Sequence, residues 1–198
     1  GPLQPLPALR EDPCELAARV RHDCPFPAGQ RPEAYQDFYL SSAWQRGERR
    51  VVERAALLGF SPRAGESVLE IGCQSGGFLQ LATLAGAEAL GVEVCPAYVD
   101  AARALARHAG MNICVRLLDA VRQRGLLLDW IRARFPRGVD HLLLLSMEKH
   151  LGEAAMFTLI DEIRARTTYL VDDAGVTVEP APCKLRAQVE ARGGVVVG

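Results

Sequence analysis

The chain has 198 residues, 49% of them hydrophobic, which is enough to bury one core, and we expect a single domain with an N-terminal extension. Its 23 basic and 24 acidic residues give a formal net charge of -1, so no global electric field draws the protein to nucleic acid. The chain has neither an apolar run of the ~18 residues that a membrane span needs nor the pattern of a signal peptide, and we expect neither feature.

The cysteines are scattered singly along the chain. They lack the C-x-x-C spacing of a zinc site and the density of a small disulfide-linked scaffold. We therefore expect reduced thiols, a cytoplasmic location and no bound metal. The six residues are Cys14, Cys24, Cys73, Cys95, Cys114 and Cys183.

Proline dominates residues 1–32, where seven of the chain's 12 prolines lie. Because proline removes backbone donors and restricts φ, this stretch is predicted to be an arm with one short helix near residues 15–21. Residues 33–62 are predicted to form N-terminal helices that cover the domain as a lid, with Gly59 as a C-cap. The apolar positions behind this prediction are Tyr35, Phe38, Tyr39, Trp44, Val51, Val52, Ala55, Ala56 and Leu57.

After Gly65, short apolar runs alternate with amphipathic segments, which is typical of a parallel sheet with helices on both faces. Residues 33–198 are therefore predicted to be one α/β domain, a doubly wound, mostly parallel sheet flanked by helices. Strands are expected at 67–71, 89–94, 112–118, 139–146, 167–172 and 195–197. Helices are expected to begin near Gly76, Pro96, Val121, Gly152 and Pro182, with Gly110 just after a helix end.

The first predicted strand runs into a glycine-containing turn, Glu70-Ile71-Gly72-Cys73-Gln74-Ser75-Gly76-Gly77. In an open α/β sheet such a turn lies in the ligand crevice, where glycine lets a ligand approach the backbone. The segment resembles motif I of class I (Rossmann-like) S-adenosylmethionine-dependent methyltransferases, acidic-x-Gly-x-Gly-x-Gly, with Gln74 in place of the middle glycine. The resemblance implies that S-adenosylmethionine binds here, with S-adenosylhomocysteine as the product. It implies cofactor contacts from Glu70, Gly72, Cys73, Gln74, Ser75 and Gly76.

A nicotinamide-binding fingerprint, G-x-G-x-x-G, is the alternative for this turn. Gly72 and Gly77 match it, again without the middle glycine, so the glycines alone do not decide. Glu70 favours the methyltransferase, because a carboxylate repels pyrophosphate but attracts the ammonium group of a methionine.

Two further acids end later strands of the predicted sheet. Glu93 lies 21 positions after Gly72, where a carboxylate can accept hydrogen bonds from both ribose hydroxyls. Asp119 ends the third strand, and in the resembling family an acid at this place accepts from the adenine amino group. Each acid alone also fits an ordinary strand end. Together with Val94 and Ala120 they complete the expected cofactor site.

The segment Ser146-Met147-Glu148-Lys149-His150 follows the fourth strand and is the expected place for the methyl acceptor. Ser146 is expected to contact the cofactor. His150 can act as a general base near neutral pH, or it is a loop histidine bonded to the backbone. Tyr39 or Trp44 closes over the sulfonium in one interpretation and packs in the core in the other.

These features predict a methyltransferase that acts on an oxygen or nitrogen of an acceptor, which the balanced charge suggests is a small molecule. RNA or protein acceptors and a non-catalytic binding subunit stay open as alternatives. In the resembling family the strand order is 3-2-1-4-5-7-6. Because the chain stops at Val195-Val196-Val197-Gly198, we expect the last strand to be missing.

Overall fold

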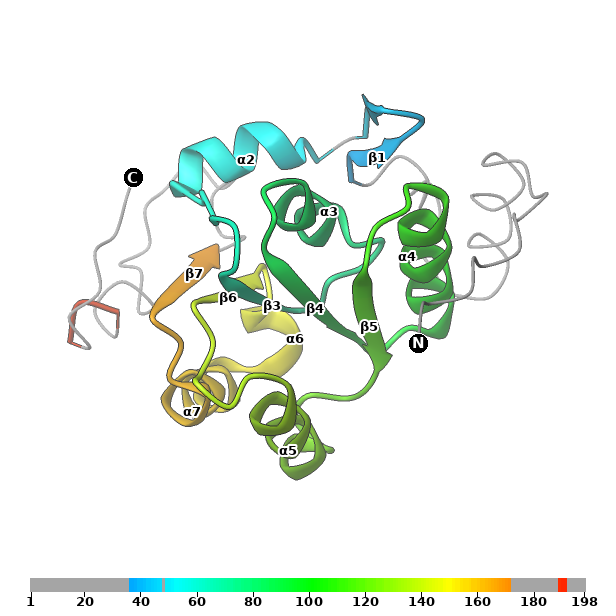
Figure 1. The fold of residues 1–198 in the computed structure, drawn as a ribbon. Helices are drawn as coiled ribbons and strands as arrows, with labels where there is room; N and C mark the ends of the chain where they lie inside the picture. Colours follow the sequence, from blue (N-terminus) through cyan, green and yellow to red (C-terminus); the bar gives the residue numbers. More distant parts are fainter. Residues whose placement is uncertain (1–35, 48, 172–188, 192–198) are drawn as a thin grey trace.

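A parallel sheet forms the centre of the protein in a computed structural model that describes residues 36–47, 49–171 and 189–191 (Figure 1). Neighbouring strands are all parallel and follow the order β5-β4-β3-β6-β7. This is the 3-2-1-4-5 part of the expected order, so the predicted sheet is confirmed for these strands. Their bounds are Ser67–Ile71 for β3, Glu88–Glu93 for β4, Ile113–Leu117 for β5, His141–Leu145 for β6 and Thr167–Val171 for β7.

Helices cover both faces of the sheet (Figure 1). One face carries α2 (Val51–Leu58), α3 (Gly77–Leu84) and α4 (Pro96–His108), and the other carries α5 (Arg124–Arg134) and α7 (Glu153–Ile163). Three predicted helix boundaries are confirmed. Gly59 and Gly110 adopt positive φ just after α2 and α4, and Pro96 is the first residue of α4. The short helix α6 (Glu148–Leu151) was not predicted. The arm over residues 1–32, the helix start at Pro182 and the strand at 195–197 lie outside the described residues.

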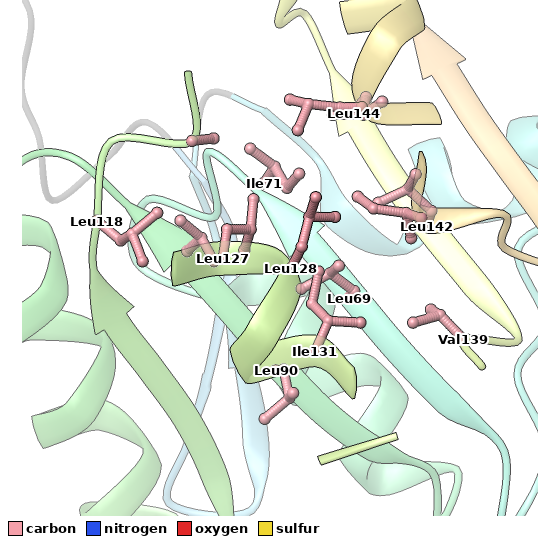
Figure 2. Packing of buried hydrophobic residues seen from close by; sticks show 14 of the residues in the cluster. Leu69, Ile71, Leu90, Leu118, Leu127, Leu128, Ile131, Val139, Leu142 and Leu144 are labelled. Atoms are coloured by element: carbon pink, nitrogen blue, oxygen red, sulfur yellow. The ribbon is translucent and has the colours of Figure 1, made fainter. Parts of the chain in front are cut away.

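Two apolar clusters hold these layers together, one on each face of the sheet. Successive strand residues point to opposite faces, so Leu142 and Leu144 join the α5 and α7 cluster while Leu143 joins the α2, α3 and α4 cluster. All three leucines are fully buried, which explains the unbroken apolar run of this central strand. Figure 2 shows the first cluster, where Leu127, Leu128 and Ile131 of α5 pack on the sheet.

The N-terminal segment forms a β-hairpin, so the predicted helix at this place is wrong. Strand β1 (Phe38–Leu40) pairs with antiparallel β2 (Ala43–Gln45). Ser41 and Ser42 both have positive φ, 51° and 62°, as the two central residues of the favoured hairpin turn do. Tyr39 and Trp44 face each other across the strands with ring centroids 5.7 Å apart, and such aromatic pairs stabilise hairpins.

Polar side chains fasten this hairpin segment to α2 and α3. The fully buried Gln80 accepts a hydrogen bond from the Tyr39 backbone N–H at 2.8 Å and donates one to the Tyr39 carbonyl at 3.0 Å. The buried Asp37 carboxylate accepts from the backbone N–H groups of Gly47 and Val51 at 2.6 and 3.2 Å. The segment is therefore an integral layer of the domain and does not lie over it as a loose cover.

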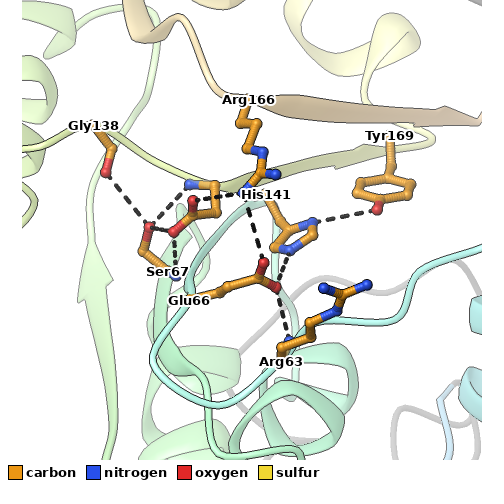
Figure 3. Close-up of polar contacts among 8 residues, drawn as sticks. Arg63, Glu66, Ser67, Gly138, His141, Arg166 and Tyr169 are labelled. Carbon is orange, nitrogen blue, oxygen red and sulfur yellow. Dashed lines mark hydrogen bonds and ion pairs between the residues drawn. The ribbon is translucent and has the colours of Figure 1, made fainter.

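A polar cluster joins β3, β6 and β7 at their amino ends (Figure 3). His141 is 2.8 Å from Glu66 through Nε2 and 3.2 Å from the Tyr169 hydroxyl through Nδ1, so one tautomer donates to the carboxylate and accepts from the hydroxyl. The Asp140 carboxylate accepts from the backbone N–H and the hydroxyl of Ser67 at 2.9 and 2.8 Å.

These contacts shift the ionisation of the groups in the cluster. Hydrogen bonds from His141 and from the Arg63 backbone lower the pKa of Glu66. Those from Ser67 lower the pKa of Asp140, and burial raises the pKa of Tyr169. Both carboxyl groups are therefore held in the ionised form that accepts these hydrogen bonds.

Cys73 and Cys114 are free thiols, whereas Cys95 is disulfide-bonded, so the expectation of reduced cysteines does not hold for Cys95. None of the helices in the described part of the chain combines the length and the apolar character that crossing a bilayer requires.

Candidate functional site

The turn between β3 and α3 contains three residues in the left-handed region. Gly72, Gln74 and Gly76 have φ values of 77°, 48° and 80°. The Gly76 N–H donates to the Cys73 carbonyl at 2.8 Å and closes a four-residue turn in which Gln74 is the first central residue. A turn with positive φ at its first central residue favours glycine there, so Gln74 adopts a backbone conformation that suits glycine better than glutamine.

A cavity of about 550 Å³ opens at the carboxyl ends of β3, β4, β5 and β6. The sheet topology brings these four ends together, because parallel strands end at the same edge. The predicted site residues that line it are Gly72, Gln74, Glu93, Val94, Asp119, Ala120 and His150. The sequence-based prediction missed Ile71, Val92, Tyr98, Leu118, Val121, Arg122, Met147 and Leu151, which also line it.

Glu93 lies between the β3 turn and the start of α4. Its carboxylate accepts from the backbone N–H groups of Val94 and Cys95 at 2.8 and 2.9 Å, and from that of Gln74 at 2.9 Å. Only 6% of the residue is exposed. A carboxylate has about four acceptor positions, so about one is left for a ligand. Glu93 therefore also organises the turn, a role that was not predicted.

The β5 side of the cavity combines apolar surface with one acid. Asp119 Oδ1 accepts from the backbone N–H groups of Val121 and Arg122 at 3.0 and 2.9 Å, while Oδ2 lies 3.7 Å from the Arg122 Nε. Val94 and Val121 line the cavity and are 64% and 42% exposed. Exposed valines at neighbouring strand ends form walls that an apolar, flat group can cover.

Glu70 is buried beside the turn and does not line the cavity. It is 1% exposed, and its Oε2 has no hydrogen-bond partner within the described residues. Burial raises the pKa of Glu70 well above the usual range, and Arg54 opposes the rise. Burial thus disfavours the ionised form of Glu70, in contrast to the carboxylate that the sequence predicted at the site.

The other turn residues predicted at the site, Cys73, Ser75 and Gly76, lie outside the cavity lining. The Cys73 side chain is fully buried and packs so close to Gly91 that a Cβ there would be 2.6 Å from Cys73 Sγ. Gly77 also faces away from the cavity, because a Cβ on it would lie 2.5 Å from the Asp37 carbonyl oxygen. Packing within the domain, and not a ligand, requires glycine at positions 77 and 91.

The remaining predicted residues are also outside the lining. Ser146 has a φ of 60°, and its hydroxyl is 3.4 Å from Arg49 Nη1. Tyr39 and Trp44 contact each other edge to face in the hairpin, with an interplanar angle of 71°, and Trp44 packs against the α2, α3 and α4 cluster. Both rings are half-buried.

The β6 side of the cavity is formed by Met147, His150 and Leu151. His150 is exposed, and its backbone N–H donates to the Met147 carbonyl at 3.1 Å as part of α6. Its imidazole is thus available to solvent and to a ligand in the cavity. His150 is the one histidine among the cavity-lining residues and is the candidate general base there.

Solved structures of known proteins share this fold. A SAM-dependent methyltransferase from Archaeoglobus fulgidus has a TM-score of 0.50 and 20% identity over 72% of this chain and 67% of that chain. The bifunctional kinase-methyltransferase WbdD has a TM-score of 0.54 and 17% identity over 79% of this chain and 34% of that one.

A further similar structure is a SAM-dependent methyltransferase from Thiobacillus denitrificans in complex with S-adenosyl-L-homocysteine. It has a TM-score of 0.45 and 20% identity, and the match covers 57% of this chain but only 42% of the Thiobacillus protein. No protein-family model and no curated protein matches the chain. The Archaeoglobus and WbdD structures confirm the fold that the resemblance implied.

Proposed function

We propose that the chain binds S-adenosylmethionine in the cavity at the carboxyl ends of β3 to β6 and transfers its methyl group to an oxygen or nitrogen of a small acceptor molecule. The observation that carries the proposal is the order of chemical groups around the cavity. An apolar wall with Asp119 lies on the β5 side, the Glu93 carboxylate lies at the end of β4, and the turn at Gly72 lies at the end of β3.

This order matches the parts of an adenosine. Val94 and Val121 can cover the two faces of the purine, and burying such exposed apolar surface favours binding. The Asp119 Oδ2 accepts no backbone hydrogen bond from any described residue and can accept from the exocyclic amino group beside Arg122. Glu93 can accept from one ribose hydroxyl, because three backbone N–H groups occupy its other acceptor positions. The volume of about 550 Å³ is within the range of ligand pockets.

The charge of the cavity suits a cationic ligand. Glu93 and Asp119 supply two carboxylates, against which Arg122 is the one permanently cationic side chain in the lining. When bound, S-adenosylmethionine supplies a methyl group on a positively charged sulfonium. Carboxylates around a partly enclosed cavity attract such a cation. This balance of charge does not favour a pyrophosphate.

The chain's own contribution to methyl transfer is mainly orientation of the acceptor, since displacement at a methyl carbon needs an aligned nucleophile. His150 can take the proton that a hydroxyl or amine acceptor loses as its bond to the methyl carbon forms and the carbon-sulfur bond breaks. An acceptor that carries no such proton does not need His150.

Calorimetric titration of the protein with S-adenosylhomocysteine and, separately, with NAD tests the proposal. We expect micromolar binding of S-adenosylhomocysteine and no binding of NAD. NAD binding alone would refute the methyltransferase assignment and favour the nicotinamide alternative.

Two matched variants test whether S-adenosylhomocysteine binds in this cavity. Val94→Asp adds a charge to the cavity wall and should weaken S-adenosylhomocysteine binding at least about ten-fold, because it removes apolar contact with the base. Leu117→Asp changes a residue that is 52% exposed, pairs with Glu93 across the sheet and does not line the cavity. The affinity of the Leu117→Asp variant for S-adenosylhomocysteine should stay within about two-fold of that of the parent. Equal effects would place the ligand elsewhere.

Turnover separates an enzyme from a binding subunit. The protein is incubated with methyl-labelled S-adenosylmethionine and with a metabolite extract, total tRNA or a protein extract. Label in a small molecule supports the proposal, whereas label in RNA or protein identifies a macromolecular acceptor. Micromolar binding without transfer to any pool supports the non-catalytic alternative.

A further inference from the structure

The Met147 side chain fills the space above Gly72. A Cβ added at Gly72 would clash with Met147 Sδ and would lie 2.9 Å from its Cε. Both residues line the cavity, Gly72 from the end of β3 and Met147 from the segment after β6. The open space that glycine provides at this turn is therefore occupied by a thioether from the protein itself.

The strand order shows which part of the cavity Met147 occupies. In the order β5-β4-β3-β6, the residues after β5 are at one end, Glu93 is in the middle, and Gly72 and Met147 are at the other end. A nucleoside with its base on the β5 side and its ribose at Glu93 directs its 5′ substituent toward β3 and β6. Met147 thus lies in the path of the 5′ substituent.

Met147 is suited to move. Its side chain is unbranched with three rotatable bonds, so it adopts new rotamers easily. It is half-buried and contacts the edge of the α5 and α7 cluster without belonging to the fully buried part. Leu151 lies at the same edge and also lines the cavity, but it does not lie over Gly72.

We propose that Met147 is a displaceable plug that determines how much an amino-acid tail on the 5′ carbon adds to the affinity of an adenosine ligand. A tail-bearing ligand has to move Met147 away from Gly72, whereas a nucleoside without the tail binds with Met147 in place. This inference rests on the proposed function.

Calorimetry with two ligands tests the plug. S-adenosylhomocysteine carries the tail, and 5′-methylthioadenosine has the same nucleoside and sulfur without it. Met147→Ala should tighten binding of S-adenosylhomocysteine about five-fold, because the ligand no longer has to move the Met147 side chain out of its preferred rotamer. The affinity for 5′-methylthioadenosine should stay within about two-fold of the parent. Met147→Leu, of similar volume but stiffer, should weaken the tail-bearing ligand alone. Leu151→Ala is the matched control and should change both affinities by the same factor.

The outcomes separate this inference from the proposed function. If both ligands bind the parent protein and Met147→Ala weakens S-adenosylhomocysteine or shifts both affinities equally, Met147 is a contact or packing residue and the plug is refuted. If neither ligand binds the parent or the variants, the proposed function fails, and the plug fails with it.

Discussion

Glu93→Gln should destabilise the protein even without a ligand, because the carboxylate holds the turn between β3 and α3. Glutamine has nearly the same shape. Its one carbonyl oxygen can still accept from Val94 and Cys95, but its amide NH₂ then faces the Gln74 N–H, which is also a donor. One charge-assisted hydrogen bond is lost in a residue that is 6% exposed. The expected loss is about 1.5–3 kcal/mol in the free energy of unfolding.

Urea unfolding followed by far-UV circular dichroism at neutral pH measures this loss. Glu88→Gln is the matched control, since Glu88 lies on the same strand at its amino end and forms a surface ion pair with Arg134. Surface pairs of this kind contribute about 0–1 kcal/mol. If Glu93→Gln destabilises no more than Glu88→Gln does, the turn does not depend on the carboxylate and the reasoning is refuted.

The same variant has a second expected effect, on binding. If Glu93 also accepts from a ribose hydroxyl, Glu93→Gln should weaken S-adenosylhomocysteine by about 1–3 kcal/mol, measured by calorimetry well below the unfolding temperature. A stability loss with an unchanged dissociation constant would leave Glu93 as a residue of the turn and remove it from the ligand site.

Three further substitutions test other parts of the structure. Burial raises the pKa of Glu70 above 4.5, so the stability of the parent should fall as pH rises from 4.5 toward the folded pKa, by at most about 1.4 kcal/mol per pH unit. Glu70→Gln should remove this dependence. If the free energies of unfolding of the parent and the variant changed in parallel with pH, the raised pKa of Glu70 would be contradicted. Gln74→Gly should raise the unfolding temperature because it relieves a φ of 48°, whereas Ser75→Gly, where φ is not positive, should lower it. Equal shifts would show that the turn is not strained. Leu142→Ala removes a side chain with 0% exposure and should lower the free energy of unfolding by about 2–5 kcal/mol in urea titrations, while Leu117→Ala, at 52% exposure, should lower it far less.

The sheet could be predicted because its strands carry a strong local pattern. Buried parallel strands need apolar residues on both faces, and Leu142, Leu143 and Leu144 satisfy this without any tertiary information. The glycine-containing turn and the acids at the strand ends followed from the same reasoning. Glu93 and Asp119 line the cavity for that reason, since the end of a parallel strand can be located from the sequence alone.

The hairpin could not be predicted in the same way. Tyr35, Phe38 and Tyr39 have a spacing that fits a helix face, and the turn residues Ser41 and Ser42 lack the Asn-Gly signal of a two-residue hairpin turn. The antiparallel pairing of Tyr39 with Trp44 and the buried amide of Gln80 on α3 decide the outcome. The first contact crosses a tight turn and the second joins residues 41 positions apart, and periodicity reports neither.

The direction of individual side chains at the site also depends on tertiary structure. Alternation along β3 puts Glu70 on the same face as Val68 and opposite Ile71, and the cavity opens on the Ile71 side. The alternation was visible in the sequence, but the face on which the cavity opens was not. Met147 was missed for a similar reason, because only the packing of the segment after β6 brings its side chain over Gly72.

The polar cluster of Glu66, Ser67, Asp140, His141 and Tyr169 has a consequence for redesign of this protein. It ties three adjacent strands at the edge of the sheet remote from the cavity, so strand register does not depend on the loops around the ligand. Loop libraries built to change the lining of the cavity can therefore vary residues 146–152 while these anchoring contacts are kept. Randomising the anchor would instead risk slippage of the strands, which would turn apolar side chains toward water.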